Sequence, residues 1–80
     1  MEAVLKRIFK MMEGLGSDSN YVIKSWILGQ IAGNIQKGTN VWTIHGYAEN
    51  CGEILEEILE ALEVHYKKLT CEDNIFTVEV

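Results

Sequence analysis

The chain of 80 residues contains no proline and only two cysteines. Proline interrupts helices because it lacks a backbone N–H and its ring clashes with the preceding turn, so no helix here is broken in that way. Two cysteines are too few for the disulfide framework of a small secreted domain. No apolar run of the signal-peptide type precedes Lys6 and Arg7. We therefore expect a cytoplasmic protein with reduced cysteines.

Basic residues and long apolar runs are also scarce. The formal net charge is −5, and the seven Lys and Arg residues are scattered along the chain. An acidic domain repels phosphate backbones, which disfavours direct nucleic-acid binding. The longest apolar stretch spans about 15 residues and contains Lys24, Gln30 and Asn34, whereas a membrane-spanning helix needs about 20 apolar residues. We expect neither a nucleic acid nor a membrane as a partner.

Side chains that could carry catalysis are few. The chain has two histidines and two cysteines, which are residue types that bind zinc. Their spacing in the sequence differs from that of short-loop zinc sites. Cys51 and His65 would lie about 21 Å apart on one continuous helix. Cys51 near a helix start, with His45 as its base, is a candidate for thiol chemistry, but its place on an apolar stripe favours a small core residue. We expect no catalytic activity, no cofactor and no metal site.

The segment from Tyr21 to Lys37 is the one around which the rest of the chain is organised. Its apolar residues recur at three- and four-residue intervals, which predicts a helix, and they occupy more than one face. Such a helix has to be covered on at least two sides. Ser25, Gly29 and Gly33 form a further row with almost no side chain. We expect this stripe to let another backbone approach closely; the alternative is that the glycines only loosen the helix.

Two other segments have clear periods. Glu2–Glu13 repeats apolar residues at helical spacing and should form an antiparallel hairpin with the central helix. Val41–Tyr47 alternates with a period of two and is rich in β-branched and aromatic residues, which predicts a strand. Trp42 and Ile44 should face the helices. The residues expected to face away from them are Val41, Thr43, His45 and Tyr47.

The last third of the chain allows two interpretations. In the preferred one, Asn50 to Leu69 forms one long helix with a glutamate-rich outer face, and Ile75–Val80 forms an edge or interface strand. The last three elements would then be a β-α-β unit with parallel strands. In the alternative, the helix ends near Leu62, and Val64–Thr70 is a strand in a hairpin with the C-terminal segment.

The predicted fold is a single α+β domain over residues 1–80 with the order α-α-β-α-β, in which a helical hairpin packs on a two-stranded sheet. Two strands alone make a marginal sheet, and their free edges invite pairing. The central helix also has more apolar surface than its neighbours can cover. Both points favour a homodimer that completes the sheet or packs the central helices together.

Acidity, small size, surplus apolar surface and the lack of a catalytic set favour a protein–protein interaction module of the adaptor, regulator or inhibitor type. Its partner would be a second copy or a basic protein. The alternative is a small-molecule-binding module with an apolar pocket between the central helix and the sheet, near Trp26, Trp42 and Tyr47. The candidate interaction surface comprises Ser25, Gly29, Gly33, His45, Tyr47, Glu53, Glu56, Glu57 and Glu60.

Overall fold

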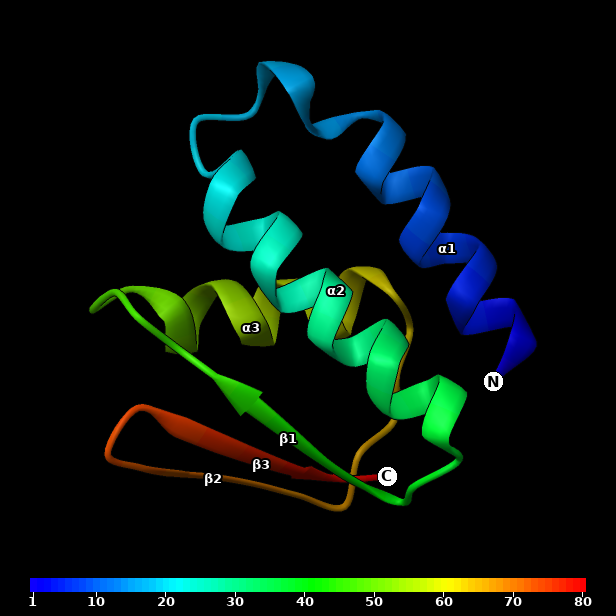
Figure 1. Ribbon diagram of the computed structural model, residues 1–80, viewed down its shortest axis with the longest axis vertical. Coiled ribbons are helices and arrows are strands. Elements are labelled where there is room, and N and C mark those ends of the chain that lie inside the picture. Colours follow the sequence, from blue (N-terminus) through cyan, green and yellow to red (C-terminus); the bar gives the residue numbers. More distant parts are fainter.

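The computed structural model describes all 80 residues and contains three α-helices and one three-stranded antiparallel sheet (Figure 1). The predicted α+β class is confirmed. None of the helices is both long enough and apolar enough to cross a membrane. The elements are α1 (Glu2–Glu13), the short 3₁₀ helix η1 (Leu15–Ser17), α2 (Tyr21–Lys37), β1 (Val41–His45), α3 (Cys51–Ala61), β2 (Lys68–Glu72) and β3 (Ile75–Glu79).

The sheet has the strand order β1-β3-β2, and β3 is antiparallel to both neighbours. The sheet therefore has three strands rather than the predicted two. The prediction of parallel strands joined by a β-α-β crossover is wrong, and so is the placement of the last strand at an edge. The third strand, β2, occupies a segment that the preferred interpretation assigned to the helix. The alternative of a C-terminal hairpin is right in kind, with the strand beginning at Lys68 rather than at Val64.

Two local features end α3 early and turn the chain into this hairpin. Leu62 is fully buried at the end of α3, and Glu63 follows with a left-handed φ of 58° and pairs with Arg7 of α1 at 3.0 Å. Asp73 and Asn74 also have positive φ values, of 50° and 63°, as a two-residue turn of the I′ type requires. Because this turn makes the pairing of β2 with β3 local in sequence, strand formation prevails over further helical turns.

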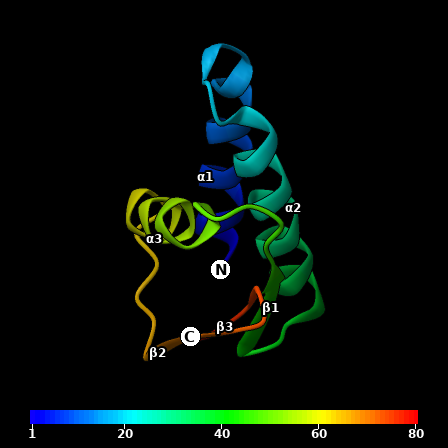
Figure 2. The same ribbon diagram turned by 90° about the vertical axis from the view of Figure 1, so that its left-hand side faces the viewer.

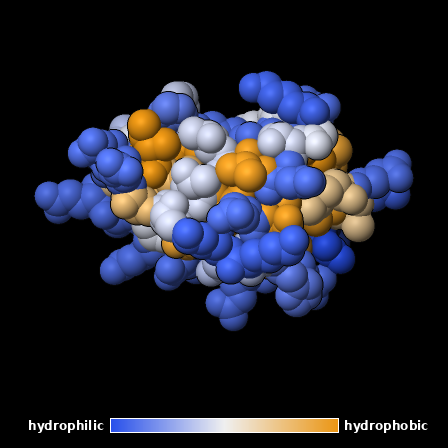
Figure 3. Space-filling view, turned by 90° about the horizontal axis from the view of Figure 1, so that it is seen from below, coloured by the Kyte–Doolittle hydropathy of each residue, from blue (hydrophilic) through white to orange (hydrophobic).

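The core lies between the helices and one face of the sheet, and all 17 of its buried residues are apolar. Trp42 and Ile44 of β1 point towards the helices, which confirms the predicted inward face, and Phe76 and Val78 of β3 do the same. Figure 2 shows the helices gathered on one side of the sheet. The view from below shows apolar atoms only as patches among polar ones (Figure 3). The outward residues Thr43, His45 and Thr70 are exposed, so no helix covers the outer face of the sheet.

The small-residue stripe on α2 does not mediate close packing within the chain. A Cβ atom added at Gly29 or at Gly33 would meet nothing within 4 Å. The prediction that another backbone approaches along this stripe is therefore wrong for the single chain. The physical reason is that Ile27, Leu28 and Ile31 face the core, which turns the glycine row outwards.

Candidate functional site

A row of side chains on α2 fastens this helix to the outer edge of β1; we call it the α2 ladder. Trp26, Gln30 and Asn34 are four residues apart and so share one helix face. The Trp26 indole N–H donates to the His45 carbonyl. The Gln30 amide donates to the same carbonyl at 2.9 Å and accepts the His45 N–H at 2.7 Å. The Asn34 amide donates to the Thr43 carbonyl at 3.2 Å. The ladder thus satisfies backbone groups that an edge strand otherwise leaves unpaired.

The start of α2 is held by an ion pair between Asp18 and Lys24. The Asp18 carboxylate accepts a hydrogen bond from the Lys24 ammonium at 2.8 Å and another from the Asn20 backbone N–H at 2.8 Å. The bond from Lys24, followed by the bond from the Asn20 N–H, lowers the pKa of Asp18, and the same ion pair raises the pKa of Lys24. These contacts fix the first turn of α2, where Tyr21 and Val22 lie.

Between these two anchors lies an exposed apolar concavity, the aromatic surface, formed by Tyr21, Val22, Ser25, Trp26 and Tyr47. Its volume is about 720 Å³, and it is wide open to solvent. The exposed fractions are 52% for Tyr21, 55% for Val22, 48% for Trp26 and 54% for Tyr47. The rings of Trp26 and Tyr47 meet edge to face, with centroids 6.0 Å apart and planes at 86°. The surface is therefore assembled from α2 and the loop after β1.

The predicted pocket lined by both tryptophans does not form. Trp42 lies on the inward face of β1 and is fully buried in the core. Trp26 instead belongs to the α2 ladder at the outer edge of the same strand. Because one ring fills the core and the other lies at the surface, only Trp26 takes part in the apolar concavity.

The structure brings together the part of the predicted interaction surface that lies on α2 and β1. Ser25 lines the aromatic surface, whereas Gly33 and His45 line a separate polar hollow of about 350 Å³ along the α2 ladder. Gly29 is exposed on the same row of α2. His45 lies on the outward face of β1 as predicted, and Tyr47, just beyond the strand, is also exposed.

The acidic part of the predicted surface lies elsewhere. Glu53, Glu56, Glu57 and Glu60 are all exposed on α3, and none of them forms an ion pair; the two ion pairs of the chain are Arg7–Glu63 and Asp18–Lys24. Helix α3 packs against α2, and Glu57 lies near Lys24 at the start of α2. None of the four glutamates, however, lines the aromatic surface. The acidic face of α3 and the aromatic surface are therefore two separate surfaces.

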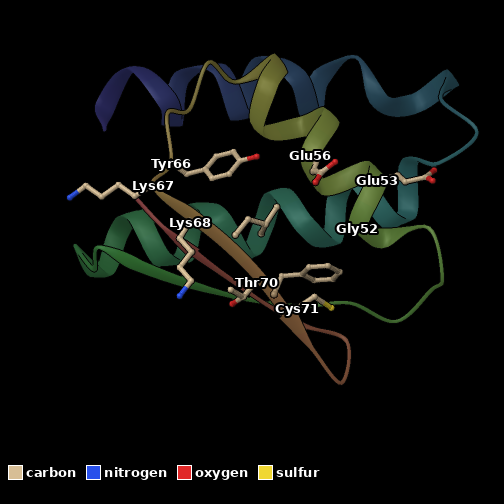
Figure 4. A pocket seen from close by; sticks show the side chains of 10 residues that line it. Gly52, Glu53, Glu56, Tyr66, Lys67, Lys68, Thr70 and Cys71 are labelled. Atoms are coloured by element: carbon tan, nitrogen blue, oxygen red, sulfur yellow. The ribbon is translucent and has the colours of Figure 1, made fainter.

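A cleft of about 560 Å³ separates α3 from β2 (Figure 4). Glu53 and Glu56 line its α3 side, and Lys67 and Lys68 line its other side together with Tyr66. The cleft is open because no helix covers β2. It has walls of opposite charge and an exposed cysteine, Cys71, but no arrangement of a nucleophile with a base.

The two cysteines have different surroundings. Cys51 is buried on the apolar stripe of α3 and packs beside Gly46, which agrees with the interpretation as a small core residue. Cys71 is exposed on β2. No three side chains of His, Cys, Asp or Glu lie close enough together to hold a metal ion.

No protein-family model, no curated protein and no solved structure matches the chain.

Four residues of the site were not singled out from the sequence: Tyr21, Val22, Gln30 and Asn34. The side-chain amides of Gln30 and Asn34 are the feature of the sequence from which part of this site could have been predicted. Gln30 and Asn34 interrupt an otherwise apolar helix at the same four-residue spacing from Trp26, which marks a polar contact along one row. No local signal distinguishes Tyr21 and Val22 as exposed rather than core residues.

Proposed function

We propose that the protein is a non-catalytic protein-interaction module that binds another protein through the aromatic surface. One observation supports this most directly. Four large apolar side chains, each about half exposed, gather in one concavity. The other exposed large apolar residues do not line it; they are Met1, Phe9, Val41, Tyr66 and Ile75. Exposed apolar patches of this kind mark interaction sites, and Trp and Tyr are the residues most enriched where binding energy concentrates.

The rigidity of the surface supports the same proposal. Trp26 is fixed by its bond to the His45 carbonyl and by its edge-to-face contact with Tyr47. Tyr21 and Val22 sit in the helical turn that the Asp18–Lys24 pair anchors. Side chains that are already ordered lose little conformational entropy when a partner binds.

The shape of the concavity favours a protein over a small molecule. Small-ligand sites enclose most of the ligand surface, typically about 70–90%. The aromatic surface is shallow and has only five lining residues. Such a surface suits an apolar anchor side chain projected by a partner, surrounded by a polar rim.

The acidic face of α3 supplies a second feature of the proposed module. Its four unpaired glutamates and the net charge of −5 favour a basic partner, by faster encounter and by exclusion of acidic competitors.

The test is a site-specific photo-cross-link made in cells that produce the protein. A photoreactive phenylalanine analogue at position 21 should yield one discrete adduct with another protein. The matched control carries the same analogue at position 9, because Phe9 on α1 is 54% exposed but lies outside the aromatic surface. Absence of an adduct at position 21, or the same adducts at both positions, would reject the aromatic surface as the binding site.

The small-molecule alternative has its own readout. Trp26 is the exposed tryptophan and Trp42 is buried, so a ligand in the concavity changes the emission of Trp26. A saturable change with apolar ligands that is lost in Trp26→Phe would favour that alternative.

A further inference from the structure

The two edges of the sheet are treated differently. The outer edge of β1 is occupied by the α2 ladder, whose amides and indole bond to the backbone of Thr43 and His45. The outer edge of β2 has no such cover, and no side chain bonds to its backbone. Because unpaired N–H and C=O groups on an edge strand are a template for another strand, β2 is the one open edge of this sheet.

The contacts of the α2 ladder with β1 determine which backbone N–H and C=O groups of β2 point away from the sheet. The backbone groups of Thr43 and His45 point to α2, so β1 residues 42 and 44 bond to β3 residues 78 and 76. In an antiparallel sheet, the backbone groups of successive residues point alternately to the two sides of the strand. The N–H and C=O groups of β3 residues 75, 77 and 79 therefore point to β2, where their partners are residues 72, 70 and 68, respectively. Leu69 and Cys71 are left with their N–H and C=O groups pointing outwards.

The sequence of β2 is complementary to itself when reversed. The strand reads Lys68-Leu69-Thr70-Cys71-Glu72. If two copies run antiparallel about a two-fold axis at Thr70, Lys68 of each copy lies opposite Glu72 of the other. Leu69 lies opposite Cys71 in both halves. This register also makes each Leu69–Cys71 pair the hydrogen-bonded kind, as the free backbone groups require.

We propose that β2 is a self-association edge, at which two copies of the chain pair antiparallel about Thr70 into one continuous six-stranded sheet. The occupant is a second copy because β2 carries one lysine and one glutamate at its ends, and these fall opposite each other when the strand pairs with its own reversed copy. The arrangement is closed by its two-fold symmetry and leaves no further strand edge free.

The environment of β2 fits this pairing on both faces. On the outer face, Thr70 lies beside Thr77 and then Thr43, and pairing extends this threonine row into the second copy. On the inner face, Leu69 is half-buried and Cys71 is exposed beside the open cleft. Pairing brings two such leucines and two such cysteines together, where no helix covers them.

The first test measures the solution mass of the full chain by light scattering over a range of concentrations. We expect twice the 9.1 kDa mass of one chain at high concentration. Glu72→Lys should weaken the association about tenfold, because it places lysine opposite lysine twice per dimer. Glu72 pairs with Ile75 within its own chain, so this change adds no like-charge contact inside the fold.

A charge exchange makes the test specific for the register. Lys68→Glu combined with Glu72→Lys restores the opposite charges across the two-fold axis and should recover the association. Because Lys68 lies opposite Glu79 in its own chain, the recovery is measured against Lys68→Glu alone, which has the same internal contact. Residues 68 and 72 are four apart on one extended strand, about 13 Å, and cannot compensate each other within a chain. A wild-type mass of one chain up to about 1 mM, an unaffected Glu72→Lys variant, or no recovery in the double variant would overturn the proposal.

A disulfide gives an independent check. Thr70→Cys in a Cys71→Ser background places two cysteines opposite each other in a pair without hydrogen bonds, about 4.5 Å apart at Cα, which a disulfide can bridge. Mild oxidation should therefore yield a covalent dimer. Thr43→Cys in the same background is the matched control, because it lies in the same outward threonine row at the protected edge. Equal cross-linking in both variants, or none at position 70, would also overturn the proposal. Since β2 and the aromatic surface are different surfaces, failure here leaves the proposed partner site untouched.

Discussion

At the scale of single residues, Gly46 has the closest neighbours of all the glycines in the chain. A Cβ atom at this position would lie 2.9 Å from Cε2 of Phe76 and 3.2 Å from Cβ of Cys51. Its N–H also donates to the Asn74 carbonyl at 2.8 Å, which ties the end of β1 to the hairpin turn. A side chain here requires the Phe76 ring or the backbone beside it to shift.

We expect Gly46→Ala to lower the free energy of unfolding by about 1–3 kcal/mol, because the added methyl group overpacks the contact with Phe76. Gly29→Ala is the matched control. A Cβ atom at Gly29 meets nothing within 4 Å, so alanine in this helix should raise stability by about 0.5–1 kcal/mol. Urea unfolding of both variants measures the difference; two effects of the same sign would contradict the packing described around Phe76.

Asp18 gives a prediction about pH. Its pKa is lowered mainly by the bond from Lys24 and then by the Asn20 N–H. A carboxyl group with a lowered folded-state pKa stabilises the fold above its unfolded pKa of about 3.9, and this contribution is lost as the pH falls through the folded value. Asp18→Asn should therefore be less stable than wild type at pH 7, and the gap should close as the pH falls through the lowered pKa of Asp18. A gap independent of pH, measured by urea unfolding, would show that the charge of Asp18 does not contribute.

At the scale of elements, the α2 ladder decides which strand edge is closed. Gln30 bonds to both the N–H and the carbonyl of His45. We expect Gln30→Ala to cost about 1–2 kcal/mol and to speed hydrogen exchange of the His45 amide, because that N–H loses its only partner. Gln36→Ala, an exposed glutamine on the same helix outside the ladder, is the control. Unchanged exchange at His45 in Gln30→Ala would contradict the ladder.

The elements also show where sequence reasoning succeeds. The central helix was predicted with its observed bounds, Tyr21–Lys37, because apolar residues at helical spacing fill it and Gly38 follows in a left-handed conformation. The strand β1 was predicted from its alternation, and its inward residues Trp42 and Ile44 are buried. In both cases the period of the pattern extends over the whole element.

The third helix was predicted too long for an identifiable reason. Leu62, Tyr66 and Leu69 continue the helical spacing of α3, so periodicity alone does not distinguish the helix from a loop and a strand. The deciding signal is Asp73-Asn74, a two-residue turn whose backbone makes β2 pair with β3. Exposure of Trp26 and burial of Trp42 depend on this tertiary arrangement, and therefore the aromatic surface was only partly predictable.

At the scale of the whole molecule, three surfaces remain without a partner in the chain. The aromatic surface lies on the α2 side, the acidic face lies on α3, and the open strand edge lies at β2. The aromatic surface shares no residue with β2, so a dimer through β2 leaves it free. The acidic face adjoins β2, because Glu53 and Glu56 line the cleft beside that strand. The proposed module can thus associate with itself and bind a different protein at the same time.

The measurement that tests the proposed function most directly is the affinity of the partner cross-linked at position 21 for wild type and for Val22→Asp. Val22 lies in the first turn of α2, where a carboxylate is compatible with the helix dipole. We expect Val22→Asp to weaken binding tenfold or more, which is about 1.4 kcal/mol or more, and Phe9→Ala to bind as wild type does. Equal affinities for wild type and Val22→Asp would contradict the proposed function.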